Sequence, residues 1–278
     1  MRLLAAVLAT IALVSTDAEA AGPRRGSLDL NLAYGMDIPV NGNMHEGVTA
    51  TYPDLAPFFP ALAGQSGDVA IGARSYDDFY GSSAVYRLSG SYALSDNLEL
   101  FLALSRTEGE SDLVQIGTLA TPSGGAPMPI FARFSDYRSD AAEFGARAWL
   151  GERSQRWRPY AAARLGVART DAISGVFTAP GANAAAAIPF YDDTTSLTGG
   201  LDFGVAIEVA RIRSLNAAVE LGAEAGFRYT APLDENDAAL NAIAAGGLND
   251  KSGRVSAPLM VTLRMRWGGA QMERASRF

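Results

Sequence analysis

Eight segments of this 278-residue chain alternate between apolar and polar residues with a period of two. That period is typical of a β-strand with one apolar and one polar face. From Leu98 to Leu104 every second residue is leucine, and Glu99 lies between the first two. The eight segments cover residues 28–37, 83–94, 98–105, 142–150, 161–167, 197–209, 215–229 and 255–267.

The number and spacing of these segments limit the fold. Eight is an even number, and the segments are near the length of about 9–11 residues that a tilted strand needs to cross a bilayer. The connections after the second, fourth and sixth segments are short, whereas those at 38–82, 106–140, 169–195 and 230–253 are long. We therefore predict an all-β fold, an eight-stranded antiparallel up-and-down transmembrane β-barrel with four long extracellular loops and short periplasmic turns.

The first twenty residues have the features of a secretory signal peptide. Arg2 precedes an apolar run over 3–14, and Ala18-Glu19-Ala20 offers small residues for cleavage. We therefore expect a cleaved signal peptide over 1–20, an outer-membrane barrel over 21–267 and a short periplasmic C-terminal tail over 268–278. The expected location is the bacterial outer membrane, which the chain would cross several times.

Composition excludes several classes of function. The chain has no cysteine, one histidine and a formal net charge of −7. Without cysteine there is neither a disulfide scaffold nor a thiolate metal site, and one histidine cannot form a multi-histidine metal site. The acidic balance, with no basic stripe, argues against nucleic-acid binding. We expect no catalytic residues, no metal and no cofactor.

The polar faces of the eight segments carry acidic residues and arginines in nearly equal number, Asp37 and Arg254 among them. Eight strands enclose a space that side chains alone can fill, and buried charges there need partners. We predict a paired network that plugs the lumen, with a gated small pore as the alternative. The predicted network consists of Asp29, Arg87, Glu99, Glu143, Arg147, Arg164, Asp202, Glu208, Glu220, Glu224, Arg228, Arg264 and Arg266.

Aromatic residues near the short connections are predicted to anchor the barrel at the membrane interface. These residues are Tyr92, Trp149, Trp157, Tyr160 and Trp267. In outer-membrane barrels, rings of aromatic residues flank the apolar outer wall on both sides. The prediction therefore requires these side chains to point outward.

The first long connection contains an apolar segment over 52–62 that exceeds what a solvated loop needs. It would pack onto the barrel rim, cap the mouth of the barrel, or form an exposed contact patch for a partner, consisting of Tyr52, Leu55, Phe58, Phe59 and Leu62. His45, in the same connection, has no catalytic signature around it and is predicted to be a surface residue. In the second connection, the turn-rich segment 121–127 could top a pair of strands that projects beyond the membrane.

Three stretches of sequence resemble small outer-membrane β-barrels of the OmpA-like group. They are Arg158-Pro159-Tyr160, the glycine-rich strand from Leu197 to Gly204, and the strand from Val219 to Tyr229. Members of this group are structural, adhesive, weakly pore-forming or of unknown role, so the resemblance implies location more than activity. The last predicted strand ends at Trp267, while the aromatic Phe278 lies beyond it, so either aromatic could serve as the assembly signal.

The sequence favours a non-enzymatic, closed structural scaffold whose long loops contact envelope components or a partner. The alternative is a small porin-like channel gated by the lumenal arginines and glutamates. A lipid-modifying enzyme using His45 and a periplasmic ligand-binding barrel are further hypotheses. The expected partners are outer-membrane lipid and lipopolysaccharide, the barrel-assembly machinery during biogenesis, and a protein bound through the outer loops.

Overall fold

The computed structural model describes residues 21–122, 125–152, 155, 157–242, 248–249 and 252–268. The predicted signal peptide, 1–20, and nearly all of the predicted tail lie outside these residues. Among the described residues, no helix is both long and apolar enough to cross a membrane.

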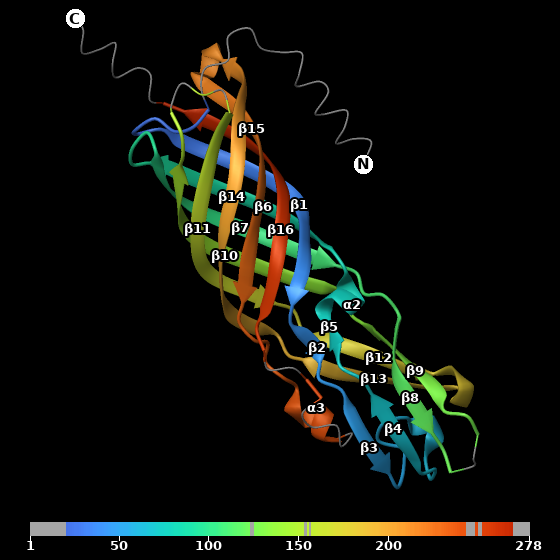
Figure 1. Cartoon of the computed structure of the whole chain (residues 1–278). Coiled ribbons are helices and arrows are strands. Elements are labelled where there is room, and N and C mark those ends of the chain that lie inside the picture. Colours follow the sequence, from blue (N-terminus) through green and yellow to red (C-terminus); the bar gives the residue numbers. More distant parts are fainter. Residues whose placement is uncertain are drawn as a thin grey trace, which may run out of the picture.

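Eight antiparallel strands form a closed barrel in the order β1-β16-β15-β14-β11-β10-β7-β6 (Figure 1). Each strand pairs with the preceding and following barrel strands in the sequence, and β1 pairs with β16 to close the cylinder. This is the predicted up-and-down topology. The strands are β1 (Leu28–Asn41), β6 (Ser83–Ala93), β7 (Leu98–Gly109), β10 (Tyr137–Trp149), β11 (Trp157–Thr170), β14 (Thr194–Ile212), β15 (Ala217–Thr230) and β16 (Arg254–Trp267).

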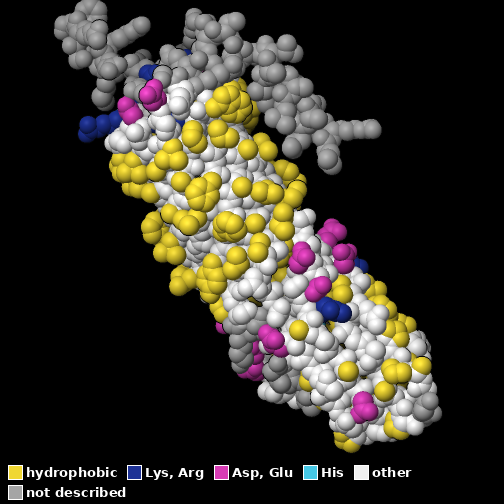
Figure 2. Space-filling view, in the orientation of Figure 1, with side chains coloured by type: hydrophobic (Ala, Val, Ile, Leu, Met, Phe, Trp, Pro, Cys, Tyr) yellow, Lys and Arg dark blue, Asp and Glu magenta, His cyan; other side chains and the backbone are white. Residues whose placement is uncertain are grey.

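The barrel wall is apolar outside and polar inside, the inverse of a soluble barrel. Along β7 the leucines point outward and are exposed, with Leu102 at 70 %, whereas Glu99 between them is fully buried. In Figure 2 apolar side chains cover the visible barrel wall. A closed barrel satisfies every strand edge internally, so such a wall can lie in lipid.

Several barrel strands are longer than the sequence predicted. β10 begins at Tyr137 instead of 142, and β11 covers Trp157–Thr170 instead of 161–167. The added strand residues at the end of the long connections carry outward-facing charges, which interrupt the apolar alternation without ending the strand. Arg106 and Asp140, for example, pair across β7 and β10, with Arg106 Nε 2.7 Å from Asp140 Oδ1.

The barrel has two different ends. At the turn end, where the described chain starts and stops, short connections join β6 to β7, β10 to β11 and β14 to β15, the last through the 3₁₀ helix η3 (Arg213–Leu215) (Figure 1). The four longer connections leave from the opposite end, the loop end. The first three of them contain further strands, of which the sequence predicted only the pair on either side of 121–127.

These connections together build a second, six-stranded sheet, here called the loop sheet, in the order β13-β12-β9-β8-β4-β3. The first three long connections each supply one hairpin, and pairs β4–β8 and β9–β12 join the hairpins. Segment 121–127, of which 123–124 lie outside the described residues, is placed between the paired strands β8 and β9, so the strand pair predicted there is confirmed, and its projection beyond the membrane stays a prediction. The loop-sheet strands are β3 (Val48–Tyr52), β4 (Gly67–Ile71), β8 (Val114–Ala120), β9 (Met128–Phe134), β12 (Ile173–Ala179) and β13 (Ala184–Tyr191).

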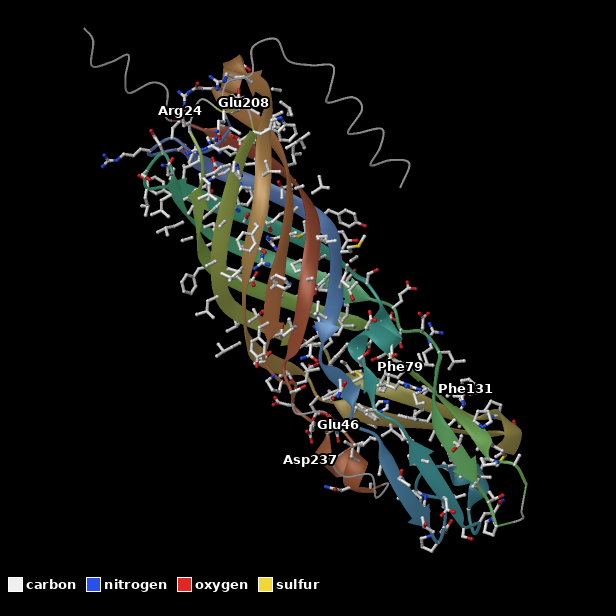
Figure 3. The ribbon with its side chains drawn as sticks, viewed as in Figure 1. Arg24, Glu46, Phe79, Phe131, Glu208 and Asp237 are labelled. Atoms are coloured by element: carbon white, nitrogen blue, oxygen red, sulfur yellow. The ribbon has the colours of Figure 1, made fainter. Side chains whose placement is uncertain are left out.

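Smaller elements link the loop sheet to the barrel. Strand β2 (Asn43–His45) pairs with β5 (Arg74–Ser75), and helix α2 (Tyr76–Tyr80) follows, with Phe79 in the position labelled in Figure 3. Ser75 and Asp78 form a capping box that fixes the start of α2. The remaining elements are the 3₁₀ helices η1 (Pro60–Leu62) and η2 (Pro180–Ala182), and α3 (Asp237–Ala242), which contacts β13.

The loop sheet encloses its own hydrophobic core, and this corrects one prediction. Tyr52, Leu55, Phe58, Phe59 and Leu62 are all within this core and at most 5 % exposed, so they are not an exposed contact patch. Phe58 packs edge-on against Phe59 and Phe177, with ring centroids 4.8 and 5.8 Å away. Their burial explains the apolar composition of 52–62 without an external partner.

The prediction for His45 is also wrong. Its side chain is fully buried, because β2 lies beneath the loop sheet and not on its surface.

Candidate functional site

All thirteen residues of the predicted charge network are buried, and each is at most 6 % exposed. Twelve of them lie in the lumen and fall into two groups, one near the turn end and one at mid-height, while Glu208 lies at the edge of the turn end. The mid-height arginines have carboxylate partners on other strands.

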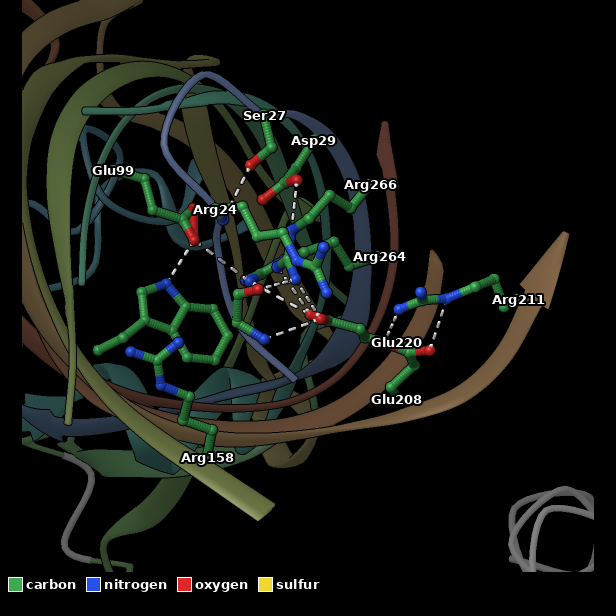
Figure 4. A network of polar contacts seen from close by, with 12 residues as sticks. Arg24, Ser27, Asp29, Glu99, Arg158, Glu208, Arg211, Glu220, Arg264 and Arg266 are labelled. Carbon is green, nitrogen blue, oxygen red and sulfur yellow. Dashed lines mark hydrogen bonds and ion pairs between the residues drawn. The ribbon is translucent and has the colours of Figure 1, made fainter. Parts of the chain in front are cut away.

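Glu99 is the centre of the turn-end group (Figure 4). Its Oε2 accepts a hydrogen bond from Arg147 Nη1 at 3.1 Å, and its Oε1 lies 3.5 Å from Arg264 Nη1. The indole N–H of Trp149 also donates to Glu99. One buried carboxylate on β7 therefore joins β10 and β16 across the lumen.

Arg266 is the second centre of the turn-end group. Its Nε donates to Asp29 Oδ1 at 2.9 Å, while its two terminal nitrogens donate to both Glu220 oxygens at 2.5 and 3.0 Å. The backbone of Gly22 enters the same group, because its N–H donates to Glu220 and its carbonyl accepts from Arg266. The segment that precedes β1 thus closes the barrel at the turn end. The sequence analysis missed this contact.

The mid-height group consists of three arginines and three carboxylates. Arg87 Nη1 lies 2.5 Å from Glu224 Oε1, and Arg164 Nη2 donates to Asp202 Oδ1 at 2.9 Å. Arg164 and Arg228 approach Glu143 at 3.5 and 3.6 Å. The charges balance within this layer, which is the condition for burying them.

Glu208 lies apart from both groups, at the edge of the turn end. Both of its carboxylate oxygens accept hydrogen bonds from Arg211, at 3.2 and 3.1 Å, and Arg211 is partly exposed. The predicted network is therefore two lumenal groups and one peripheral pair.

The loop-end half of the lumen has a different composition. Its inward side chains are mostly hydroxyls, namely Ser83, Ser105, Thr107, Ser139, Thr170, Thr194, Thr198, Thr230 and Ser256, all buried. Between these hydroxyls and the loop sheet, Arg254 Nη2 pairs with Asp37 Oδ2 at 3.1 Å. The Arg254 guanidinium lies 4.4 Å from the ring centre of Tyr137 and 5.7 Å from that of Tyr76. This cation–π contact caps the lumen beneath the loop sheet.

Two of the five predicted interface aromatics point inward, so that prediction is wrong for them. Trp149 and Tyr160 are at most 3 % exposed, and their rings contact each other at a tilt of 50° with centroids 4.9 Å apart. The Tyr160 hydroxyl donates to Glu224 at 3.1 Å. Trp149 has the same strand parity as Glu143 and Arg147, and this signal in the sequence places it inside. Tyr92 and Trp157 are exposed and Trp267 is partly exposed, and their place at the interface stays a prediction.

The three tryptophans allow a spectroscopic check of these orientations. In vesicles that contain brominated lipid, Trp157→Phe should remove most of the quenchable tryptophan emission, because Trp157 is 58 % exposed and Trp149 only 3 %. Trp149→Phe should leave the emission intensity that the brominated lipid removes nearly unchanged. Strong quenching of Trp149 in a Trp157→Phe/Trp267→Phe variant would show that its side chain faces lipid.

The chemistry available in the lumen is ion pairing and hydrogen bonding. Among the described residues, no group of three or more histidine, aspartate or glutamate side chains is placed to hold a metal. Some guanidinium nitrogens, such as Arg87 Nε and Arg264 Nε, are buried and have no hydrogen-bond partner within the described residues. Buried N–H groups of this kind are commonly satisfied by water.

Comparisons with known proteins identify no family: no protein-family description matches the chain, and neither does any curated protein. Among solved structures, the chain is similar to the neisserial surface protein A at 14 % identity, covering 86 % of this chain and 96 % of that one, with a TM-score of 0.38. It is also similar to OprG from Pseudomonas aeruginosa at 11 % identity, covering 88 % of this chain and 97 % of that one, with a TM-score of 0.37. A further similar structure is the outer membrane protease OmpT from Escherichia coli, at 9 % identity, covering 87 % of this chain and 96 % of that one, with a TM-score of 0.35.

The architecture defines the class of protein independently of these similarities. A closed barrel of eight antiparallel strands, with an exposed apolar wall and a buried charged interior, is an integral outer-membrane β-barrel.

Proposed function

We propose that this protein is a closed, non-enzymatic scaffold that carries a folded loop sheet on the outer face of the outer membrane. One observation supports this most strongly: the long connections meet in one sheet with one hydrophobic core, above a lumen filled with paired charges. Outer-membrane barrels place their longer loops outside the cell. Ordered loops with a core of their own favour a display function over a flexible lid.

The contact surface in this proposal is the outer face of the loop sheet, because the large apolar side chains of 52–62 that the sequence offered as a contact patch are buried. That face carries Val176, half-exposed at 46 %, beside Arg133 on the neighbouring strand. The proposed partners are an envelope component or protein bound at this face, outer-membrane lipid and lipopolysaccharide around the wall, and the barrel-assembly machinery during biogenesis.

The surroundings of His45 support the non-enzymatic part of the proposal. A serine–histidine hydrolase needs a histidine whose ring nitrogen reaches a nucleophile. Within the described residues neither ring nitrogen of His45 has a hydrogen-bond partner, and three phenylalanine rings surround it.

A small pore is the second candidate, favoured by the hydroxyl groups that line the loop-end half of the lumen and by the guanidinium nitrogens without a hydrogen-bond partner among the described residues. Both features would hold water, and continuous water would conduct ions. In this candidate the ion pairs of Arg264 would gate the path, since Arg264 lies between Glu99 and Glu220 at 3.5 and 3.7 Å.

Single-channel recording separates the two candidates. The mature protein is refolded into a planar bilayer, after heat-modifiable migration in SDS gels has shown that the barrel has formed. The scaffold proposal expects no discrete openings, and the Arg264→Gln variant serves as the positive control for a loosened network. Regular openings of the unaltered protein would reject the closed scaffold and favour the pore.

A further inference from the structure

His45, the only histidine of the chain, lies where all four long connections meet. Its strand, β2, pairs with β5 in the first connection, and His45 also forms a bridge with Asn249 of the fourth. The ring lies among three phenylalanines, with centroid distances of 6.0 Å to Phe79 of the first connection, 6.5 Å to Phe134 of the second and 6.4 Å to Phe190 of the third.

The same point carries backbone contacts between these connections. Glu46 N–H donates to the Leu248 carbonyl at 2.7 Å, and the Tyr191 hydroxyl donates to the Met44 carbonyl at 2.9 Å. His45 is therefore placed between the parts that must separate if the loop sheet opens at its base.

Within the described residues, no hydrogen-bond acceptor contacts the His45 ring that could stabilise its protonated form. Both of its nitrogens are buried without a hydrogen-bond partner in the described part of the chain. The charged groups that face it are Arg74 on β5 and Asp78 on α2, and the Asp78 carboxylate already accepts hydrogen bonds from Ser75 N and Oγ at 2.8 and 3.0 Å. The side chains that face it from β9, β13 and position 249 are uncharged.

These surroundings favour the neutral ring. The pKa of His45 is lowered from 6.5 to about 4, first by burial and then by the nearby Arg74, while Asp78 acts in the opposite direction. In an opened loop sheet the ring would regain an ordinary pKa near 6.5. The open form therefore binds the proton first, so the closed form is favoured above pH 6.5 and loses stability as the pH falls from 6.5 towards 4.

We propose that His45 is an acid-sensitive contact that holds the loop sheet closed, and that its protonation opens the junction between β2 and the 248–249 segment. Opening would expose the aromatic core beneath the sheet while the barrel remains intact. The proposal goes beyond the scaffold function and does not depend on whether the lumen conducts.

Proteolysis of the full chain in phosphatidylcholine vesicles tests this. Cleavage by proteinase K is measured at pH 5.0 and 7.5, and each rate is divided by the rate for the unfolded chain at that pH. For the unaltered protein the normalised rate should rise by about 30-fold at pH 5.0, given the two pKa values above. Heat-modifiable migration in SDS gels, measured at both pH values, should show the barrel unchanged.

The matched control is His45→Phe, which fills the aromatic surroundings with a ring that cannot take a proton. Its normalised rates at the two pH values should agree within about twofold. His45→Gln, also unable to titrate, replaces it if the phenylalanine variant does not fold. An equal acid response in the unaltered protein and the variant, or no response in the unaltered protein, would overturn the proposal.

Discussion

Replacing Glu99 with glutamine should lower the free energy of unfolding of the barrel by about 3–5 kcal/mol, the usual cost of removing one partner of a buried ion pair. Glu99 is fully buried and is approached by Arg147 and Arg264, at 3.1 and 3.5 Å. A neutral amide leaves both guanidiniums without this carboxylate in a region that water reaches poorly. The measurement is urea unfolding in vesicles, followed by heat-modifiable migration in SDS gels.

Glu110→Gln is the matched control, because Glu110 is an exposed glutamate just beyond the end of β7. It should change the stability by less than about 0.5 kcal/mol, as for most surface substitutions. The double variant Glu99→Gln/Arg147→Met should lose less than the two single variants added together, since the double change removes both members of one pair. A Glu99→Gln effect no larger than that of Glu110→Gln would contradict the assignment of Glu99 as the centre of the turn-end group.

The barrel was predictable from the sequence because the periodicity of two acts at every barrel strand. A side chain of given parity faces either lipid or the lumen, and a shift by one residue would reverse every side chain of a strand. This is why all thirteen predicted lumenal charges are buried. Trp149 obeys the same parity, so its position in the strand outweighs the general preference of tryptophan for the membrane interface.

The loop sheet was not predictable in the same way. Its strands are five to eight residues long, and their pairings β4–β8 and β9–β12 join hairpins that are distant in the sequence. β-Propensity is context-dependent, and short strands of Ala, Gly, Thr and Pro carry little periodic signal. The apolar residues over 52–62 were a correct sign of a buried surface, but the sequence did not show which segments cover it.

Replacing Phe190 with alanine should open the loop sheet while the barrel remains folded. Phe190 is fully buried on β13, with ring centroids 5.1 Å from Phe134 and 5.6 Å from Phe177. Removing a buried phenylalanine ring costs about 3–5 kcal/mol. That is a large share of what a small sheet with its own core has available. At pH 7.5 proteinase K should cut the connections at a rate raised by at least tenfold, while heat-modifiable migration in SDS gels stays as in the unaltered protein.

The control for Phe190 is Phe131→Ala, on β9 of the same sheet. Phe131 alternates with the buried Ile130 and Ala132 and is itself only partly buried, so its ring lies on the outer face (Figure 3). Its loss should raise the cleavage rate less than about threefold, because little apolar surface is uncovered. Equal effects of the two variants would mean that the shared core does not hold the sheet closed. A matching loss of barrel resistance in Phe190→Ala would mean that the loop sheet and the barrel unfold as one cooperative unit, and the scaffold would then have no independently folded outer part.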